Sequence, residues 1–202
     1  MKIIGLTGPS GAGKGMAASV FEYHNIPGVD TDEVYREVVA PPSKCLDELV
    51  CEFGKKIIRA DGSLNRKKLA AAVFSDKSKK KLAKLNEITH KYIRARSKEL
   101  ISEFEKNGER FLVFEVPLLF ESGFDADCDV TVSIIADRDT RIARIVKRDN
   151  ISRRAAAARV DAQMPDDFYV SRSDYVVFNN GTQKELSEKI EGIIKELEES
   201  SD

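Results

Sequence analysis

Residues Gly8 to Lys14 read Gly-Pro-Ser-Gly-Ala-Gly-Lys and match the spaced pattern G-x-x-x-x-G-K. Glycines let such a loop turn its backbone N–H groups around a phosphate, and the dipole of a following helix favours negative charge at its start. A lysine at this position reaches the outer phosphates, where its charge can also assist transfer. The residues predicted to bind a nucleotide are Gly8, Ser10, Gly11, Ala12, Gly13, Lys14, Gly15 and Met16.

The two residues after this lysine are unusual. Gly15 stands where the motif normally has Ser or Thr, and Met16 follows, so the hydroxyl that usually binds Mg²⁺ is missing. Mg²⁺ keeps several waters and can be held by phosphates and by a carboxylate reached through water. We therefore still expect ATP and Mg²⁺ to bind. A loop that binds nucleotide without catalysing transfer is the alternative.

Acidic residues follow two predicted strands. Asp30 and Asp32 come at the end of a short strand, and Glu115 ends the apolar run 111–114. Phosphoryl transfer needs one acid to position the attacking hydroxyl and another near the metal. Asp32 is the candidate base, and Asp32 with Glu115 forms the candidate metal-binding pair. Helix capping for the aspartates, and an ordinary strand end for Glu115, are the alternatives.

Seven arginines crowd into one short stretch in the second half of the chain. Arg141, Arg144 and Arg148 are spaced three and four residues apart, which places them on one face of a helix. From there they can stabilise the charge that grows on a phosphate during transfer, and we predict catalytic roles for Arg144 and Arg148. Surface ion pairs are the alternative, which we favour for Arg153 and Arg154.

The predicted elements would place these residues at one edge of a sheet. Apolar runs predict strands at 3–7, 111–116, 130–135 and 175–178, with a shorter one at 29–30. Runs that are apolar throughout favour parallel strands covered on both faces. Helices are predicted at 14–23, 139–147, 152–163 and 183–199. The alternation predicts a doubly wound parallel α/β sheet of the P-loop nucleoside-triphosphate hydrolase type.

A long helical stretch interrupts this alternation. Its predicted helices lie near 31–40, 43–53, 65–75 and 77–106. We interpret residues 1–202 as a single domain that carries a helical acceptor-binding insertion at about 41–107.

Composition limits the classes of partner. The 33 basic and 34 acidic residues leave a net charge of −1, which excludes a general electrostatic nucleic-acid binder. The three cysteines show neither a disulfide framework nor zinc-ligand spacing. No apolar stretch approaches the length of a membrane span. We expect a cytoplasmic protein with a small-molecule substrate and no nucleic-acid or membrane partner; the sequence leaves its oligomeric state open and is compatible with a monomer.

Several of these motifs occur in the order found in the dephospho-coenzyme A kinase family, which the chain resembles over residues 3–181. The most specific are Asp-Gly-Ser-Leu-Asn-Arg at 61–66 and Pro-Leu-Leu-Phe-Glu at 117–121. The others are the phosphate loop, residues 30–32, Phe53-Gly54, His90, Arg144 with Arg148, residues 159–163 and residues 174–181. The resemblance implies ATP-dependent phosphorylation of the ribose 3′-hydroxyl of dephospho-coenzyme A, the last step of coenzyme A synthesis.

The same resemblance implies that the arginine-rich segment at about 141–165 forms a lid over the nucleotide, and it implies roles for single residues. Asp32 aligns with the proposed base of the family, and Asn179 would lie near the adenine of ATP. The residues on the acceptor side would be Thr7, Arg66, His90, Pro117, Leu118 and Glu121. Ordinary ion pairing for Arg66 and a solvated helix position for His90 are the alternatives.

The chain also departs from the family, and two other functions stay open. Besides Gly15 and Met16, Glu115 stands where Asp is common, Lys91 where Pro is common, and Arg141 where Gln is common. A nucleoside monophosphate kinase of the cytidylate type is one alternative, because the loop followed by Gly15 matches that family closely. A catalytically inactive nucleotide-binding module is the other.

Overall fold

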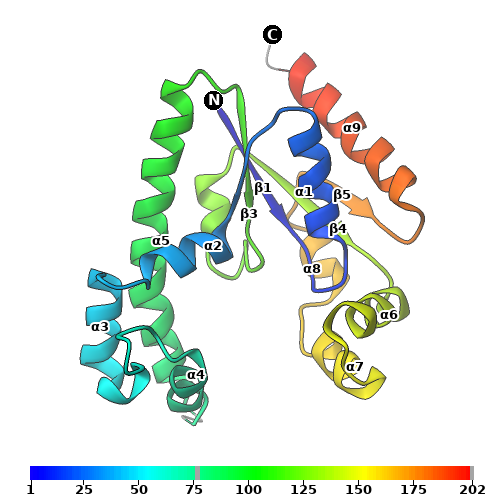
Figure 1. The fold of residues 1–202 in the computed structure, drawn as a ribbon. Coiled ribbons are helices and arrows are strands. Elements are labelled where there is room, and N and C mark those ends of the chain that lie inside the picture. Colours follow the sequence, from blue (N-terminus) through cyan, green and yellow to red (C-terminus); the bar gives the residue numbers. More distant parts are fainter. Residues whose placement is uncertain (76–77, 201–202) are drawn as a thin grey trace. The chain divides into compact units, whose positions relative to one another are not determined.

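A computed structural model describes residues 1–75 and 78–200 (Figure 1). The chain divides into two compact units. One is formed by Met1–Asp30 together with Gly108–Asp202, and the other by Thr31–Asn107. Among the residues that the structure describes, no helix is both long and apolar enough to cross a membrane.

The first unit is built on five strands, which are β1 (Lys2–Thr7), β2 (Gly28–Asp30), β3 (Phe111–Glu115), β4 (Val130–Ile135) and β5 (Tyr175–Phe178). All pairings are parallel, in the order β2-β3-β1-β4-β5. The direction of winding reverses at β1, and such a switch point is where doubly wound sheets bind ligands. The predicted fold class, a doubly wound parallel sheet, is confirmed.

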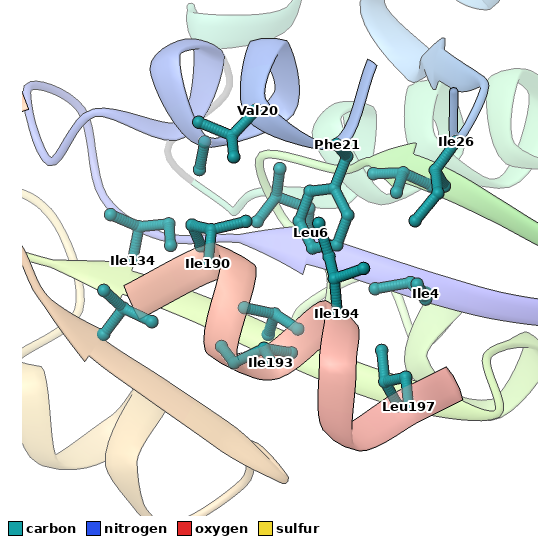
Figure 2. Packing of buried hydrophobic residues seen from close by; sticks show 14 of the residues in the cluster. Ile4, Leu6, Val20, Phe21, Ile26, Ile134, Ile190, Ile193, Ile194 and Leu197 are labelled. Atoms are coloured by element: carbon teal, nitrogen blue, oxygen red, sulfur yellow. The ribbon is translucent and has the colours of Figure 1, made fainter. Parts of the chain in front are cut away.

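Two helices cover one face of this sheet. Helix α1 (Lys14–Tyr23) lies beside α9 (Gln183–Glu199), drawn in blue and red in Figure 1. Figure 2 shows Phe21 of α1 and Ile190 of α9 packed over Ile4 of β1, and none of these three side chains is exposed to solvent. The start of α1, and with it the end of the phosphate loop, is thereby held against the sheet.

The opposite face is covered by irregular chain and short helices. Ile4 and Leu6 point toward α1 and α9, so Gly5 faces the other way. A Cβ at Gly5 would lie 2.8 Å from Cys128 Sγ and 3.1 Å from Leu119 Cδ2, which only glycine avoids. The short helices of this unit are η2 (Phe124–Asp127) and α8 (Asp166–Val170). Helix α8 was not predicted.

A helical hairpin contains the arginine-rich segment. Helices α6 (Arg138–Asp149) and α7 (Arg153–Asp161) pack through a small apolar core that includes Ile142, Ile145 and Val160. The predicted helix 152–163 ends early, at Asp161, so Gln163 lies in a loop. Pro165 lacks an N–H, and in a continued helix its ring would clash with the carbonyl of Asp161, four residues earlier.

The second unit is helical, as the sequence predicts. Its helices are α2 (Thr31–Val38), α3 (Lys44–Phe53), η1 (Lys55–Ile57), α4 (Arg66–Phe74) and α5 (Lys80–Lys106). They share a buried cluster that contains Cys45, Leu49 and Ile57. The predicted start of the long helix, Lys77, lies outside the described residues. This unit begins before the predicted insertion at about 41–107, directly after β2.

The packing of α9 gives a stability prediction. Replacing Ile190 by Ala removes a side chain with 0% exposure and leaves a cavity between α9 and the sheet. We expect the free energy of unfolding to fall by about 2–5 kcal/mol. Chemical denaturation followed by circular dichroism measures this change. Lys184→Ala, at a side chain of α9 that is 86% exposed, is the control and should change stability by less than about 0.5 kcal/mol. Equal effects of the two substitutions would contradict the packing argument.

Candidate active site

Three glycines give the phosphate loop its path. Gly8, Gly11 and Gly13 have φ values of 138°, 81° and 109°, which side chains rarely adopt. A Cβ at Gly8 would lie 2.0 Å from the backbone oxygen of Ile134, and one at Gly11 would lie 2.7 Å from that of Arg141. The loop therefore lies directly against the backbone of β4 and of α6, and larger residues at these positions would push it away.

The carbonyl groups of the loop are bound by side chains from elsewhere in the first unit. Ser10 O accepts a hydrogen bond from Arg141 Nε at 3.1 Å. Ala12 O accepts from Arg144 Nη1 at 3.2 Å and from Asn179 Nδ2 at 2.7 Å. Gly13 is the N-cap of α1, and within the described chain no side chain caps this helix. The carbonyls are thus satisfied, while the N–H groups at the start of α1 form an anion site.

Lys14, Gly15 and Met16 complete the loop and begin α1. Lys14 Nζ donates to Gly8 O at 2.8 Å, so the ammonium group is folded back over the loop. A Cβ at Gly15 would meet nothing within 4 Å, and the side chain of Met16 is partly exposed. Neither Gly15 nor Met16 has a side-chain oxygen, so no side-chain hydroxyl directly follows the lysine.

Helix α6 turns three arginines toward the loop, as their spacing predicts. Besides the contacts of Arg141 and Arg144, Arg148 Nη2 donates to Ser10 Oγ at 3.3 Å. Arg148 also pairs with Asp149, with Nε and Oδ1 2.7 Å apart. Within the described residues no carboxylate oxygen lies within 4.0 Å of the Arg144 guanidinium, so its charge has no internal counterion there. A phosphate on the loop would supply one.

Three of the four remaining arginines of the hairpin pair with aspartates, each pair joining α6 to α7, whereas no carboxylate oxygen of the described residues lies within 4.0 Å of the Arg154 guanidinium. Arg138 binds Asp161 at 2.7 Å and Arg159 binds Asp149 at 2.6 Å. Arg153 binds Asp139 at 2.8 Å, so the ion-pair interpretation of this residue is confirmed. These contacts are solvent-exposed and individually weak. They add little to the stability of the hairpin, whose two helices pack through the apolar core around Ile142.

Two carboxylates meet at the carboxyl edge of the sheet. Asp30 ends β2 and is the register partner of Glu115, which ends β3. Both residues are partly buried. Carboxylate oxygens are the ligands that Mg²⁺ prefers, and it commonly takes one or two of them together with phosphates and water. Although the described residues contain no cluster of three or more acidic, His or Cys side chains, this pair fits such a site. The pairing of Asp30 with Glu115 was not predicted.

The predicted acceptor residues in the first unit differ in exposure. Thr7 is fully buried, and its hydroxyl has no hydrogen-bond partner among the described residues. Leu118 is 58% exposed and Glu121 is also exposed. Next to the segment 117–121, burial and the negative charge of Glu121 raise the pKa of Tyr169 to about 12. Tyr169 therefore stays protonated at neutral pH and serves as a packing residue.

The predicted base, Asp32, and the other predicted acceptor residues lie in the second unit. Asp32 is exposed in the first turn of α2. The guanidinium carbon of Arg66 lies 5.5 Å from the centre of the Tyr35 ring, a cation–π contact rather than the suggested ion pair with an acid. His90 is half-buried, and burial together with the charge of Arg94 lowers its pKa below 6.5. The neutral imidazole, which can both donate and accept a hydrogen bond, is therefore the main form at pH 7.

Comparison with known proteins now identifies the family. The family model described as dephospho-CoA kinase matches residues 2–185. The chain belongs to the dephospho-CoA kinase family. Members of this family transfer a phosphoryl group from ATP to dephospho-CoA, so the protein is a kinase of coenzyme A biosynthesis, as the sequence motifs imply.

Single relatives agree with this assignment over nearly their whole length. A dephospho-CoA kinase of Listeria monocytogenes serovar 1/2a is 37% identical over 198 residues, covering 96% of this chain and 98% of the relative. A solved Thermus thermophilus structure superposes with a TM-score of 0.80 at 30% identity, covering 97% of each chain. A solved dephospho-CoA kinase from Campylobacter jejuni has the same fold, with a TM-score of 0.72 at 24% identity and complete coverage of both chains.

The close approach at Gly13 yields a prediction for nucleotide binding. In Gly13→Ala the new Cβ would lie 2.3 Å from Asn179 Nδ2, and the φ of 109° is strained for alanine. We expect the dissociation constant for ATP, measured by calorimetry, to rise at least about tenfold. Gly28→Ala is the matched control, because nothing lies within 4 Å of its Cβ. Unchanged ATP affinity in Gly13→Ala would show that the loop path does not depend on this glycine.

Proposed function

We propose that this chain transfers the γ-phosphoryl group of ATP to the ribose 3′-hydroxyl of dephospho-CoA, with the triphosphate bound by the loop and the start of α1. The arrangement of the loop carries the proposal. Arg141, Arg144 and Asn179 bind carbonyl groups of the loop, and the N–H groups of Ser10 and Ala12 donate to Gln163 Oε1 and Pro9 O, so phosphate oxygens are proposed to bind the N–H groups at the start of α1. A preorganised set of donors of this kind stabilises developing charge without reorganising during the reaction.

Cations around the loop have complementary roles in this proposal. Lys14, now folded over the loop at Gly8, turns to the outer phosphates when nucleotide binds. Arg144 and Arg148 approach the transferring group from α6, and the segment at about 141–165 closes as a lid that excludes water as the acceptor. Arg144 is best placed to bind phosphate, since it makes hydrogen bonds to loop carbonyls without a carboxylate counterion in the described chain.

Asp32 is proposed as the base. It follows the end of β2 by two residues and lies in the first turn of α2, where its side chain is exposed. A carboxylate there can orient the 3′-hydroxyl for in-line attack and accept its proton as the new O–P bond forms.

Mg²⁺ is proposed to be held by Asp32 and Glu115, in part through water. The ion would neutralise the charge of the phosphates when bound. The register of β2 and β3 puts Asp30 beside Glu115, so Asp30 is a further candidate ligand. Carboxylate oxygens would take the place of the hydroxyl that Gly15 lacks.

The acceptor is proposed to contact Thr7, Arg66, His90, Pro117, Leu118 and Glu121, with the helical residues at about 41–107 as its main binding region. Asn179 is proposed to lie near the adenine while its amide also holds Ala12 O. The near-neutral charge supports a small-molecule substrate rather than nucleic acid, and we propose that the protein is cytoplasmic.

Asp32→Asn tests the base. The substitution keeps the size of the side chain and removes its ability to accept a proton, so we expect kcat to fall about 10²–10⁴-fold while the ATP dissociation constant changes little. Glu33→Gln, one residue further on and paired only loosely with Arg36 at 3.9 Å, is the control and should retain activity. Near wild-type kcat in Asp32→Asn would exclude this aspartate as the base.

An assay of ADP release separates the proposed substrate from the alternatives. The purified protein is supplied with ATP, Mg²⁺ and, in parallel, dephospho-CoA, CMP or AMP. We expect release with dephospho-CoA to exceed release with either monophosphate by at least about 100-fold, since the acceptor site must recognise more than a phosphate. Preference for CMP would favour a cytidylate-type kinase, and ATP binding without release in any arm would favour an inactive nucleotide-binding module.

A further inference from the structure

Arg141 is a buried charge to which the proposed reaction assigns no contact with either substrate. Its exposed fraction is 4%, and burial lowers its pKa. The carboxylate nearest to it is that of Asp166, whose Oδ1 lies 4.0 Å from Nη1 and whose side chain is 45% exposed. Burying a guanidinium with so distant a counterion is costly unless its donors are well satisfied. The Nε and Nη2 groups of Arg141 donate hydrogen bonds to the phosphate loop and to Gln163, respectively.

Gln163 accepts two hydrogen bonds at a single oxygen. Its Oε1 receives the backbone N–H of Ser10 at 3.1 Å and Arg141 Nη2 at 2.6 Å. Arg141 Nε in turn donates to Ser10 O at 3.1 Å. Both backbone groups of Ser10 are therefore bound, one by each partner. The peptide groups on either side of Ser10 cannot rotate without breaking one of these bonds.

The two partners of Ser10 come from the first and the last residues of the hairpin sequence, that is, from the start of α6 and from just after the end of α7. Arg141 lies in the first turns of α6, and Gln163 follows the last residue of α7, Asp161. The hairpin is held together by its own apolar core and by the ion pair of Arg138 with Asp161. A change in the position of the end of α7 is thus transmitted to the loop through Gln163.

We propose that Arg141 and Gln163 act as positioning residues that hold Ser10, and with it the phosphate loop, in the conformation that binds ATP. We call these three connected residues the Ser10 latch. Through the latch, the conformation of the phosphate loop depends on the position of the end of α7. A triphosphate bound on the loop would also place negative charge near the buried guanidinium of Arg141. This inference rests on the proposed binding of ATP by the loop.

Two substitutions of Gln163 test the latch. Gln163→Met has a similar length and no acceptor, whereas Gln163→Glu keeps an oxygen that both donors can reach. If the loop must be ordered before ATP binds, a substitution that disorders it lowers the affinity for ATP and leaves the rate of phosphoryl transfer nearly unchanged. We therefore expect Gln163→Met to raise the KM for ATP about tenfold, with kcat and the KM for dephospho-CoA changed less than about threefold. Gln163→Glu should restore the KM for ATP to within about threefold of wild type.

A double-mutant cycle asks whether the partners act together. Arg141→Met should raise the KM for ATP in the same direction, and Arg141→Met with Gln163→Met should be little worse than the more impaired single variant. Arg153→Gln, which breaks the exposed ion pair with Asp139 in the same hairpin, is the control and should leave the KM for ATP unchanged. Thermal unfolding of each variant is measured in parallel.

The outcomes separate the latch from a structural role and from the proposed function. A lower melting temperature in Gln163→Met with a KM for ATP within twofold of wild type would overturn the latch, as would Gln163→Glu being impaired as much as Gln163→Met. Fully additive effects of the two methionine substitutions would also overturn it. Failure of the wild-type protein to bind ATP in calorimetry would instead overturn the proposed function, whatever the variants do.

Discussion

The orientation of a few peptide groups is the constraint on which the site depends. A loop binds phosphate through N–H groups only if its carbonyl groups point elsewhere and are satisfied there, because a buried carbonyl without a partner costs free energy. Here Ser10 O and Ala12 O meet donors from α6 and from the residue after β5. The arginine-rich helix therefore helps to shape the loop as well as supplying charge to a phosphate.

The sheet provides the fixed frame for this arrangement. Gly8 lies directly against the backbone of β4, and α1 is pressed onto β1 by the apolar contacts with α9. Both ends of the loop are thus anchored in the most buried part of the first unit. The middle of the loop, around Ser10 and Gly11, lies against α6 instead. Order in this middle part is set by side-chain hydrogen bonds rather than by the apolar core, so it is the part that single polar substitutions can change.

Sequence patterns predicted the features that depend on local order or on strong motifs. Apolar runs located every strand, the glycine spacing located the loop, and helical periodicity put Arg141, Arg144 and Arg148 on one face. The pattern missed α8, a single short helix, and placed Gln163 inside a helix. The hydrogen bond between Gln163 and Ser10 joins residues that are 153 positions apart in the sequence. The register of Asp30 with Glu115 likewise joins β2 to β3, a strand far along the chain. No local periodicity carries such information, because it arises only when the sheet is assembled.

The missing hydroxyl after Lys14 has a chemical rather than a steric explanation. A side chain at Gly15 would project into open space, so packing does not demand glycine there. Helical glycine also costs about 1 kcal/mol relative to alanine, which makes its presence in the first turn of α1 unfavourable by itself. The proposed metal site draws its oxygens from carboxylates, so it needs no hydroxyl from the loop. The loop then keeps only its phosphate-binding task, and that task is the one for which the carbonyl contacts from Arg141, Arg144 and Asn179 prepare it.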